Sequence, residues 1–424
     1  MARRTELLLV ASALAATGAL ARGVGCQVYD VSLLDPPADA GTTAKNGVGW
    51  WSRADSDGCF SAGVPRPEDR PPPSAAPNVE PIFMAVASMR IGSLDENGTL
   101  DPNAWQSIGF DLDGTCTGSD TCPRTGDPRV SCVPSSAQVA RDGQFCRDNT
   151  FGRLEYTAQL VPELAKKYGL NDDAFNCALC TGQYNFLLKI TGYNGLPDDD
   201  QVRVDLYPSP GLEKPLPWNC ALPDWKTHPC FTPDLPWTLR ADSVLGSTSG
   251  VDVGPSKLFD DSAYVREGYL VVRLPEDTLF WFPGTKALAV AYPLALQKGI
   301  VTGRIVKGPD GVYRIEDGII AGRAKKDDML RGFRLIGFCE DDANFPLMEQ
   351  FISSNLDTLS DGTTDPARPC DSMSVGLAFT GLQAKPGKLE AVQPLVECGG
   401  KLVDGGADAS ADAGADAPSD AADQ

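Results

Sequence analysis

The sequence predicts a mainly β protein, α+β by content, built as a disulfide-rich, β-sandwich-like domain with a few peripheral helices. Three observations support this prediction. Strand-like segments outnumber helix-like segments by about three to one. The 424-residue chain contains 43 glycines and 34 prolines, which favour turns and long connections. Its 13 cysteines indicate disulfides if the chain matures outside the cytosol.

Strand predictions come from alternating apolar residues, β-branched and aromatic content, and Gly, Pro or Asp at the boundaries. The predicted strands are 82–91, 106–112, 184–191, 201–207, 236–241, 264–274, 279–283, 300–306, 312–320 and 374–380. Helical periodicity is present at 153–168, 324–331 and 346–357. The Pro-rich stretch 208–235 is unsuited to a central strand, so we expect it to be an ordered surface loop.

The N-terminus has the pattern of an export signal. Arg3 and Arg4 give a basic start, and the run from Leu7 to Leu20 is uncharged and apolar. That run is too short to anchor the chain by spanning a bilayer. Small residues precede Cys26, and the segment resembles a bacterial lipoprotein precursor. The resemblance implies that Cys26 is lipidated and becomes the new N-terminus.

Cysteine parity agrees with lipidation. If Cys26 carries the lipid, twelve of the 13 cysteines remain, enough for six disulfides. The alternative is ordinary cleavage near Ala19 to Ala21, which leaves Cys26 for a disulfide and the protein soluble and secreted. The expected location is therefore the bacterial cell envelope, with the membrane as a partner through the lipid. The disulfide candidates are Cys59, Cys116, Cys122, Cys132, Cys146, Cys177, Cys180, Cys220, Cys230, Cys339, Cys370 and Cys398.

The chain is predicted to contain four segments. A signal peptide at 1–25 precedes a Pro-rich spacer at 26–80 that is partly pinned to the following domain. The β-rich globular domain covers 81–398 and divides into two lobes near residue 250. Residues 399–424 form an Ala/Asp/Gly tail, whose composition predicts disorder.

A calcium site is predicted around Asp111 and Asp113. The two residues alternate along a predicted strand next to Gly114, so their carboxylates lie on one face. Hard oxygen ligands of this kind suit Ca²⁺. Asp148 and Asn149, with the segment around Asp142, are candidates to complete the ligand set. The alternative is that these aspartates only cap strand ends and turns.

Two further patterns favour structure over chemistry. Asp198, Asp199 and Asp200 follow an Asn-Gly turn and are expected to be solvated, with a cation site as the alternative. Cys177 and Cys180 form a CxxC pattern, which in an oxidising compartment indicates structural disulfides rather than redox work or a zinc site.

Composition and motifs exclude several functions. The formal net charge of −20 opposes nucleic-acid binding, which needs basic patches. The single histidine, His228, excludes histidine pairs and leaves a Ser-His-Asp site resting on one residue. No nucleophile elbow, P-loop or dinucleotide fingerprint is present. We therefore predict no catalytic residue and no cofactor other than calcium.

Short motifs carry one resemblance. Gly109 to Gly114 read GFDLDG, Asp148-Asn149 follows, and Tyr193 begins YNGLPDD. Together with the leader and the tail, these motifs over about residues 80–340 resemble uncharacterised secreted lipoproteins of myxobacteria. The resemblance implies a cell-envelope address and transfers no catalytic residue.

Three functions are compatible with these observations. The first is a non-enzymatic, calcium-supported binding module for a glycan or protein, and loop tryptophans suit stacking on sugars. The second is an extracellular polysaccharide hydrolase using two carboxylates. The third is a structural envelope protein without a small ligand. The loop tryptophans are Trp50, Trp51, Trp218 and Trp225, and the hydrolase candidates are Glu155, Glu267, Glu316 and Glu349.

Overall fold

The computed structural model describes most of the predicted globular domain. The described residues are 49–54, 59–118, 122, 129–136, 140–159, 172–214, 216, 231–246, 253–276, 278–282, 292–335, 337–391, 395–398 and 401–403. The predicted signal peptide, the lipidation site Cys26, the spacer before residue 49, Cys220, Cys230 and the tail beyond residue 403 lie outside this set.

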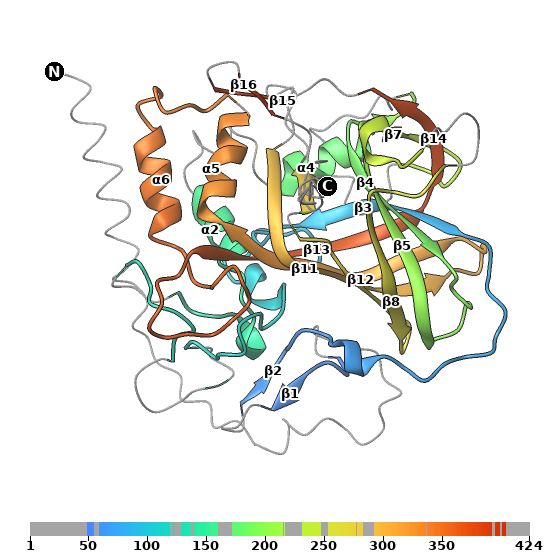
Figure 1. The fold of residues 1–424 in the computed structure, drawn as a ribbon, viewed down its shortest axis with the longest axis horizontal. Coiled ribbons are helices and arrows are strands. Elements are labelled where there is room, and N and C mark those ends of the chain that lie inside the picture. Colours follow the sequence, from blue (N-terminus) through green and yellow to red (C-terminus); the bar gives the residue numbers. More distant parts are fainter. Residues whose placement is uncertain are drawn as a thin grey trace, which may run out of the picture. The chain divides into compact units, whose positions relative to one another are not determined.

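Eight antiparallel strands form a closed ring (Figure 1). The order around the ring is β11-β12-β13-β3-β4-β5-β8-β9, and the pairing of β9 with β11 closes the ring. A further strand, β10 (Thr278–Phe282), pairs with the first part of β11. The ring strands are β3 (Ile82–Arg90), β4 (Asn185–Thr191), β5 (Asp199–Ser209), β8 (Leu258–Arg266), β9 (Tyr269–Arg273), β11 (Tyr292–Lys307), β12 (Tyr313–Lys325) and β13 (Ser372–Gln383).

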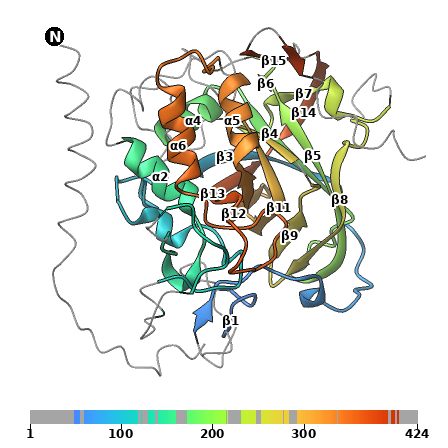
Figure 2. The ribbon, with the colours of Figure 1, turned by 60° about the vertical axis from the view of Figure 1, so that its left-hand side comes forward.

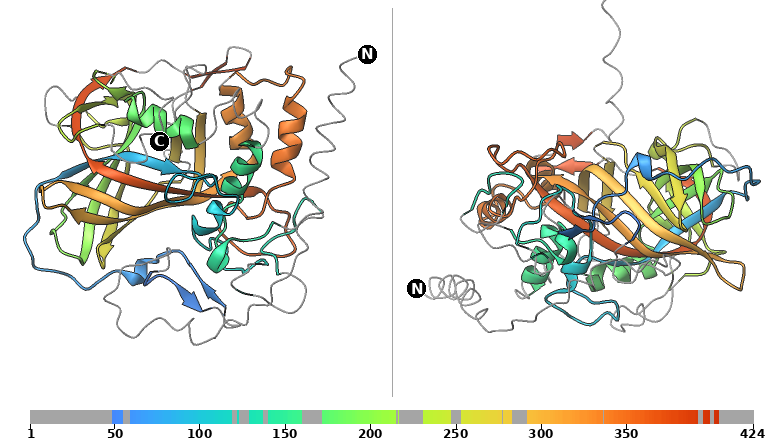
Figure 3. Two further views of the ribbon diagram at one scale, coloured as in Figure 1. Left: turned by 180° about the vertical axis from the view of Figure 1, so that it is seen from behind. Right: turned by 90° about the horizontal axis from the view of Figure 1, so that it is seen from below.

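The mainly β prediction is confirmed, but the sandwich prediction is wrong, because the sheet closes into a barrel. Closure depends on the pairing of Arg273 with Ile300 and of Tyr269 with Arg304. Register shifts at Gln297/Ile300 and Thr302/Arg304 on β11 are β-bulges or similar irregularities, which bend a strand and increase its twist. The view along another direction shows the curled sheet (Figure 3). Alternating patterns are the same in sandwiches and barrels, so the sequence did not distinguish them.

The barrel interior is filled by side chains. A large apolar cluster includes Met84, Leu188, Val204, Val272 and Val301 and continues into the helices at one end. An eight-stranded barrel is just wide enough for such a filling. Two smaller clusters lie under the segments that cover the strands: one is centred on Trp237 and Tyr207, the other on Trp51 and Phe110. The covering segments therefore have cores of their own.

Short elements and helices surround the ring (Figure 2). α5 and α6 contact each other, and α5 also packs on β11. The helices are α2 (Thr150–Gln159), α4 (Asp172–Cys180), α5 (Lys326–Leu335) and α6 (Phe345–Ser353), with 3-10 turns η2 (Pro67–Asp69), η3 (Ala104–Ser107), η4 (Gln144–Cys146) and η6 (Ala241–Ser243). The remaining strands are β1 (Arg53–Ala54), β2 (Phe60–Ser61), β6 (Gly211–Leu212), β7 (Pro236–Arg240), β14 (Lys385–Glu390), β15 (Leu395–Glu397) and β16 (Lys401–Val403).

Polar side chains complete the hydrogen bonding of β3 where β4 leaves it. β3 pairs with β4 only from Ile82 to Ala85. Beyond that point, Asn185 Oδ1 accepts from the N–H of Val86, and its Nδ2 donates to the Val86 carbonyl. Asn176 makes the same pair of bonds with Met89. These amides replace a missing strand, which buried backbone groups require.

Most strand predictions are confirmed, and two predicted strands differ from the structure. The predicted strand 264–274 is two strands, because Glu267 and Gly268 have φ of 50° and 82° and form a tight turn. The predicted strand 106–112 is wrong: η3 ends at Ser107, and only isolated bridges involve Phe110 and Asp111. The predicted helix 153–168 is observed as α2, and its part beyond Gln159 lies outside the described residues.

Disulfides confirm the interpretation of the cysteines as staples. Four pairs are described: Cys59–Cys122, Cys116–Cys146, Cys132–Cys370 and Cys339–Cys398. Cys177 and Cys180, at the end of α4, are disulfide-bonded as well. Cys132–Cys370 joins residues 238 positions apart, so it ties two distant parts of the chain, as loop-closing disulfides do.

The Asn176 amide should be essential to the stability of the barrel. Asn176→Ala leaves the Met89 N–H and carbonyl buried without partners, so we expect the free energy of unfolding to fall by about 2–4 kcal/mol. Urea denaturation measures the change. The control, Asn103→Ala, alters an exposed amide and should change stability by less than about 0.5 kcal/mol. Equal effects of the two substitutions would contradict the role given to Asn176.

Candidate cation site

Two loops lie against the outer face of β12 and β13 and carry the predicted calcium ligands. Asn149 Oδ1 accepts from the N–H of Gly376 on β13, at 2.9 Å. From β12, Arg323 Nη2 donates to the Leu112 carbonyl at 2.5 Å. A Cβ on Gly376 would lie 3.0 Å from Gly109 Cα, so a glycine is needed for this close approach. The barrel therefore sets the position of both loops.

Isolated bridges align the segments that carry Asp111 and Asp148. Phe110 and Asp148 form an antiparallel bridge, and the Asp148 N–H donates to the Phe110 carbonyl at 2.9 Å. Gly63 and Asp111 form a parallel bridge, and the Asp111 N–H donates to the Ala62 carbonyl at 2.8 Å. Three segments distant in sequence thus meet beside the barrel.

The structure brings three of the four predicted calcium ligands together. One carboxylate oxygen each from Asp111, Asp113 and Asp148 lies within 4.8 Å of the other two. Backbone N–H groups hold these carboxylates in place. Asp148 Oδ2 accepts from Leu112 at 2.7 Å and from Asp113 at 3.2 Å, and Asp111 Oδ1 accepts from Gly114 at 2.8 Å.

Burial and mutual repulsion oppose ionisation of this cluster. Burial raises the pKa of Asp113 to about 7, and the charge of Asp111 adds to the shift. The Thr115 N–H, 2.8 Å from Asp113 Oδ1, acts in the opposite direction. Burial also raises the pKa of Asp148 well above its ordinary value, with contributions from Asp113 and Asp142. A full set of negative charges here therefore needs positive compensation.

Asp142 and Asp357 extend the cluster. Asp142 Oδ2 accepts from the Thr117 N–H, and burial followed by the charge of Asp113 raises its pKa. Asp357, which sequence reasoning missed, accepts from the Ser374 N–H at 2.8 Å, and burial raises its pKa too. No local pattern pointed to Asp357, since it lies far along the chain from the other carboxylates.

Positive charge is also present near the cluster. The guanidinium of Arg323 interacts with Asp148, Asp113 and Asp357, although burial lowers its pKa. Arg153 interacts in the same way with Asp357 and Asp142. These groups compensate part of the carboxylate charge.

Asn149 has a positioning role in the structure. Its Oδ1 accepts from the N–H groups of Gly152 at 3.0 Å and Gly376 at 2.9 Å, and the side chain is 1% exposed. The amide thus joins the start of α2 to β13. Its oxygen is engaged by backbone donors, whereas the three carboxylates face one another.

In the second acidic loop, residues 198–200, the three carboxylates bind different partners. Asp198 accepts from the Glu267 N–H, Asp199 from the Asn194 N–H, and Asp200 from the Ser74 N–H. Each aspartate therefore holds a different segment. Such divided roles are typical of turn aspartates.

Two of the four hydrolase candidates form ion pairs with separate cations. Glu316 pairs with Arg304 at 2.6 Å, and Glu349 pairs with Lys326 at 3.0 Å. Trp51, one of the tryptophans considered for sugar binding, is 3% exposed and packs on Tyr269 with 5.0 Å between ring centroids. It therefore belongs to the core rather than to a binding surface.

Comparison with known proteins provides no family. No family model, curated protein or solved structure matches the chain. Among the described residues, no helix has both the length and the hydrophobicity needed to cross a bilayer.

The raised pKa of Asp113 predicts an unusual pH dependence of the free energy of unfolding, to be measured with a chelator that keeps cations away from the cluster. Asp113 has a pKa near 7 in the folded protein against 3.8 for the free side chain, so the native state binds more protons between these values. The free energy of unfolding should therefore fall as the pH rises from about 4 to about 7. Urea denaturation across this range measures the trend.

Asp113→Asn should flatten that dependence, because the amide is neutral and keeps an oxygen for the Thr115 N–H. Asp101→Asn is the matched control: Asp101 Oδ1 accepts from the Asn103 N–H at 2.8 Å in a similar turn. It should leave the pH profile unchanged. An identical profile for wild type and Asp113→Asn would show that the cluster is not the origin of the dependence.

Proposed function

We propose that this protein is an exported, lipid-anchored cell-envelope protein whose globular domain is a non-enzymatic, calcium-supported binding module. The observation that carries the calcium part is the convergence of Asp111, Asp113 and Asp148 within 4.8 Å. Calcium–oxygen distances are about 2.3–2.6 Å, so two oxygens on one ion lie at most about 5 Å apart. The carboxylate spacing fits that limit.

The chemistry of the cluster favours a hard divalent cation. All three side chains offer oxygen, which Ca²⁺ prefers, and the sulfurs nearby are in disulfides. A divalent ion would also replace the protons that the raised pKa values of Asp113 and Asp148 favour. Calcium binding would therefore keep the cluster ionised at neutral pH.

Burial favours a supporting role for the ion. Asp111 is 6% exposed and Asp148 is 3% exposed, so an ion between them would contact protein groups more than solvent. Such an ion would join the loop of Asp111 and Asp113 to that of Asp148. Catalytic metals need an open coordination position, and this enclosed arrangement suits a structural ion better.

The proposed cell-envelope location and the proposed class of ligand rest on the sequence. The leader before Cys26 and the disulfides support maturation outside the cytosol. A glycan or protein ligand in the envelope fits an acidic, β-rich module that lacks a catalytic motif. Binding to an array of envelope glycans, with and without calcium, tests this part.

Calcium should stabilise the wild-type protein. At about 100 times its dissociation constant, it should add about 2.7 kcal/mol to the free energy of unfolding and raise the melting temperature. Differential scanning calorimetry with calcium and with chelator measures the shift. An unchanged melting temperature, together with no bound metal by mass spectrometry, would refute the calcium part.

Removal of one carboxylate should weaken the binding. Asp148→Asn keeps an oxygen for the Leu112 N–H but removes a charge, so we expect calcium affinity to fall by about tenfold or more. Isothermal titration calorimetry measures the affinity. Asp101 is not one of the three clustered carboxylates, so Asp101→Asn should bind calcium as the wild type does.

Lipidation should place the mature protein in the membrane fraction. Mass spectrometry of that fraction should find Cys26 as an acylated N-terminus, and Cys26→Ser should release the protein from the membrane. A mature chain that begins before Cys26 and carries no lipid would contradict the anchor and favour the secreted soluble form.

A further inference from the structure

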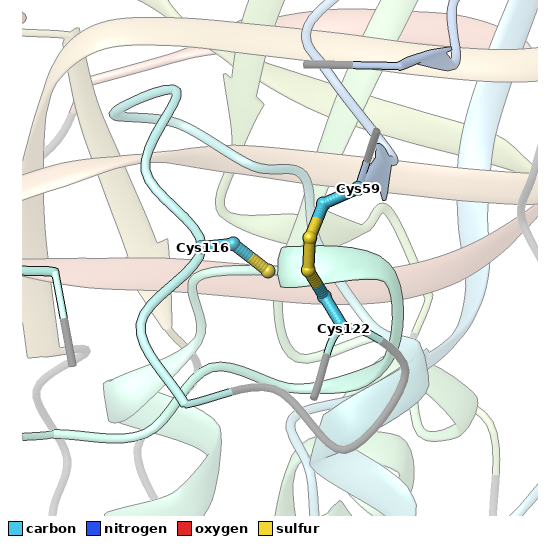
Figure 4. Close-up of side chains that lie close together, drawn as sticks. All are labelled: Cys59, Cys116 and Cys122. Carbon is cyan, nitrogen blue, oxygen red and sulfur yellow. A yellow bond between two sulfur atoms is a disulfide. The ribbon is translucent and has the colours of Figure 1, made fainter. Parts of the chain in front are cut away.

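Four cysteines gather beside the candidate cation site. The Sγ atoms of Cys59, Cys116 and Cys122 lie within 4.8 Å of one another, and Cys116 is bonded to Cys146. All four residues are buried and form one cluster. Figure 4 shows Cys59 and Cys122 joined, with the sulfur of Cys116 pointing toward them. A thiol formed by reduction of Cys59–Cys122 would thus lie close to the Cys116–Cys146 disulfide.

We propose that Cys59, Cys116, Cys122 and Cys146 form a thiol–disulfide exchange unit, in which reduction of Cys59–Cys122 is passed to Cys116–Cys146. Exchange requires a thiolate next to a disulfide sulfur. A thiolate on Cys59 or Cys122 would lie within 4.8 Å of Cys116 Sγ, and rotation about its side-chain bonds covers the remaining distance. Such proximity gives an internal thiol a large rate advantage over an external one.

The reaction has two balanced steps. A protein dithiol first reduces Cys59–Cys122: the reductant becomes a disulfide, and two protein thiols form. One of these thiols then loses its proton and attacks Cys116 Sγ. The Cys116–Cys146 bond breaks, a new bond joins Cys116 to Cys59 or Cys122, and Cys146 leaves as a thiolate that takes up a proton.

Backbone strain favours release of Cys146. Phe145 and Cys146 are consecutive non-glycine residues with φ of 54° and 60°, a conformation that persists only where the surroundings enforce it. The Cys116–Cys146 bond is one such constraint. Its loss would allow the segment of η4 to relax.

The consequence for the cation site rests on the proposed function. Cys116 follows Asp113 by three residues, and Cys146 precedes Asp148 by two, so their disulfide holds the two ligand loops together. Exchange would remove that link and lower calcium affinity. The unit would then make calcium binding depend on the redox state of the envelope.

Partial reduction of the full mature chain tests the exchange. A limiting amount of phosphine at acidic pH, where thiolates are scarce, produces molecules with one disulfide reduced. The pH is then raised for increasing times, thiols are alkylated, and peptides are mapped by mass spectrometry. We expect peptides that link Cys116 to Cys59 or Cys122, with alkylated Cys146. Cys132–Cys370 and Cys339–Cys398 serve as controls and should keep their native partners.

A variant tests the internal thiol separately. Cys59→Ser/Cys122→Ser removes it, so reduction of Cys116–Cys146 by a dithiol should slow by about tenfold or more. The proposal is overturned if no new linkage forms and the variant is reduced at the wild-type rate.

The calcium readout separates the two proposals. Cys116→Ser/Cys146→Ser should lower calcium affinity by about tenfold or more, whereas Cys339→Ser/Cys398→Ser should not. If oxidised wild type binds no calcium, the proposed function fails, but the peptide map still decides the exchange. If wild type binds calcium and Cys116→Ser/Cys146→Ser binds it equally, redox control of the site is wrong.

Discussion

The pairing of β9 with β11 closes the sheet, and the rest of the structure depends on that closure. A closed ring leaves no long exposed edge and encloses one apolar interior. The outer faces of the strands then become platforms for the connecting segments. β12 and β13 provide such a platform, on which Arg323 and Gly376 hold the loops of the candidate cation site. The candidate site is therefore built on the outside of the barrel.

When the barrel holds those loops in place, it brings together negative charges that the protein must compensate. Asp148 accepts backbone hydrogen bonds from Leu112 and Asp113, an arrangement that stabilises the loop and also brings like charges together. Arg323 and Arg153 offset part of the repulsion. Protons or a cation must offset more of it at neutral pH. Loop geometry and the proposed ion binding would thus depend on the same electrostatic balance.

Local patterns in the sequence predicted much of this arrangement, and non-local contacts explain what they missed. Alternation located most ring strands, Asp111 and Asp113 stood out beside a glycine turn, and Asp148 was a candidate to complete the ligand set. The predicted strand through Asp111 was wrong, yet the carboxylates converge because the Cys116–Cys146 disulfide and the Phe110–Asp148 bridge bring the loops together. Barrel closure and Asp357 depend on residues far apart in sequence, so local periodicity carried no signal for either.

The Cys116–Cys146 disulfide joins the same two loops at which we propose that calcium binds, and chemistry sets the order of the two events. The loop that carries Asp113 and the segment that carries Asp148 repel each other when ionised, so the covalent link between Cys116 and Cys146 opposes their separation. Without the link, the repulsion would have to be overcome by the ion at the moment of binding. With the link, the loop-closure entropy has already been lost, and the proposed ion would meet a preformed set of ligands. If calcium binds as we propose, disulfide formation should precede its tight binding, and the proposed export would come before assembly of the site.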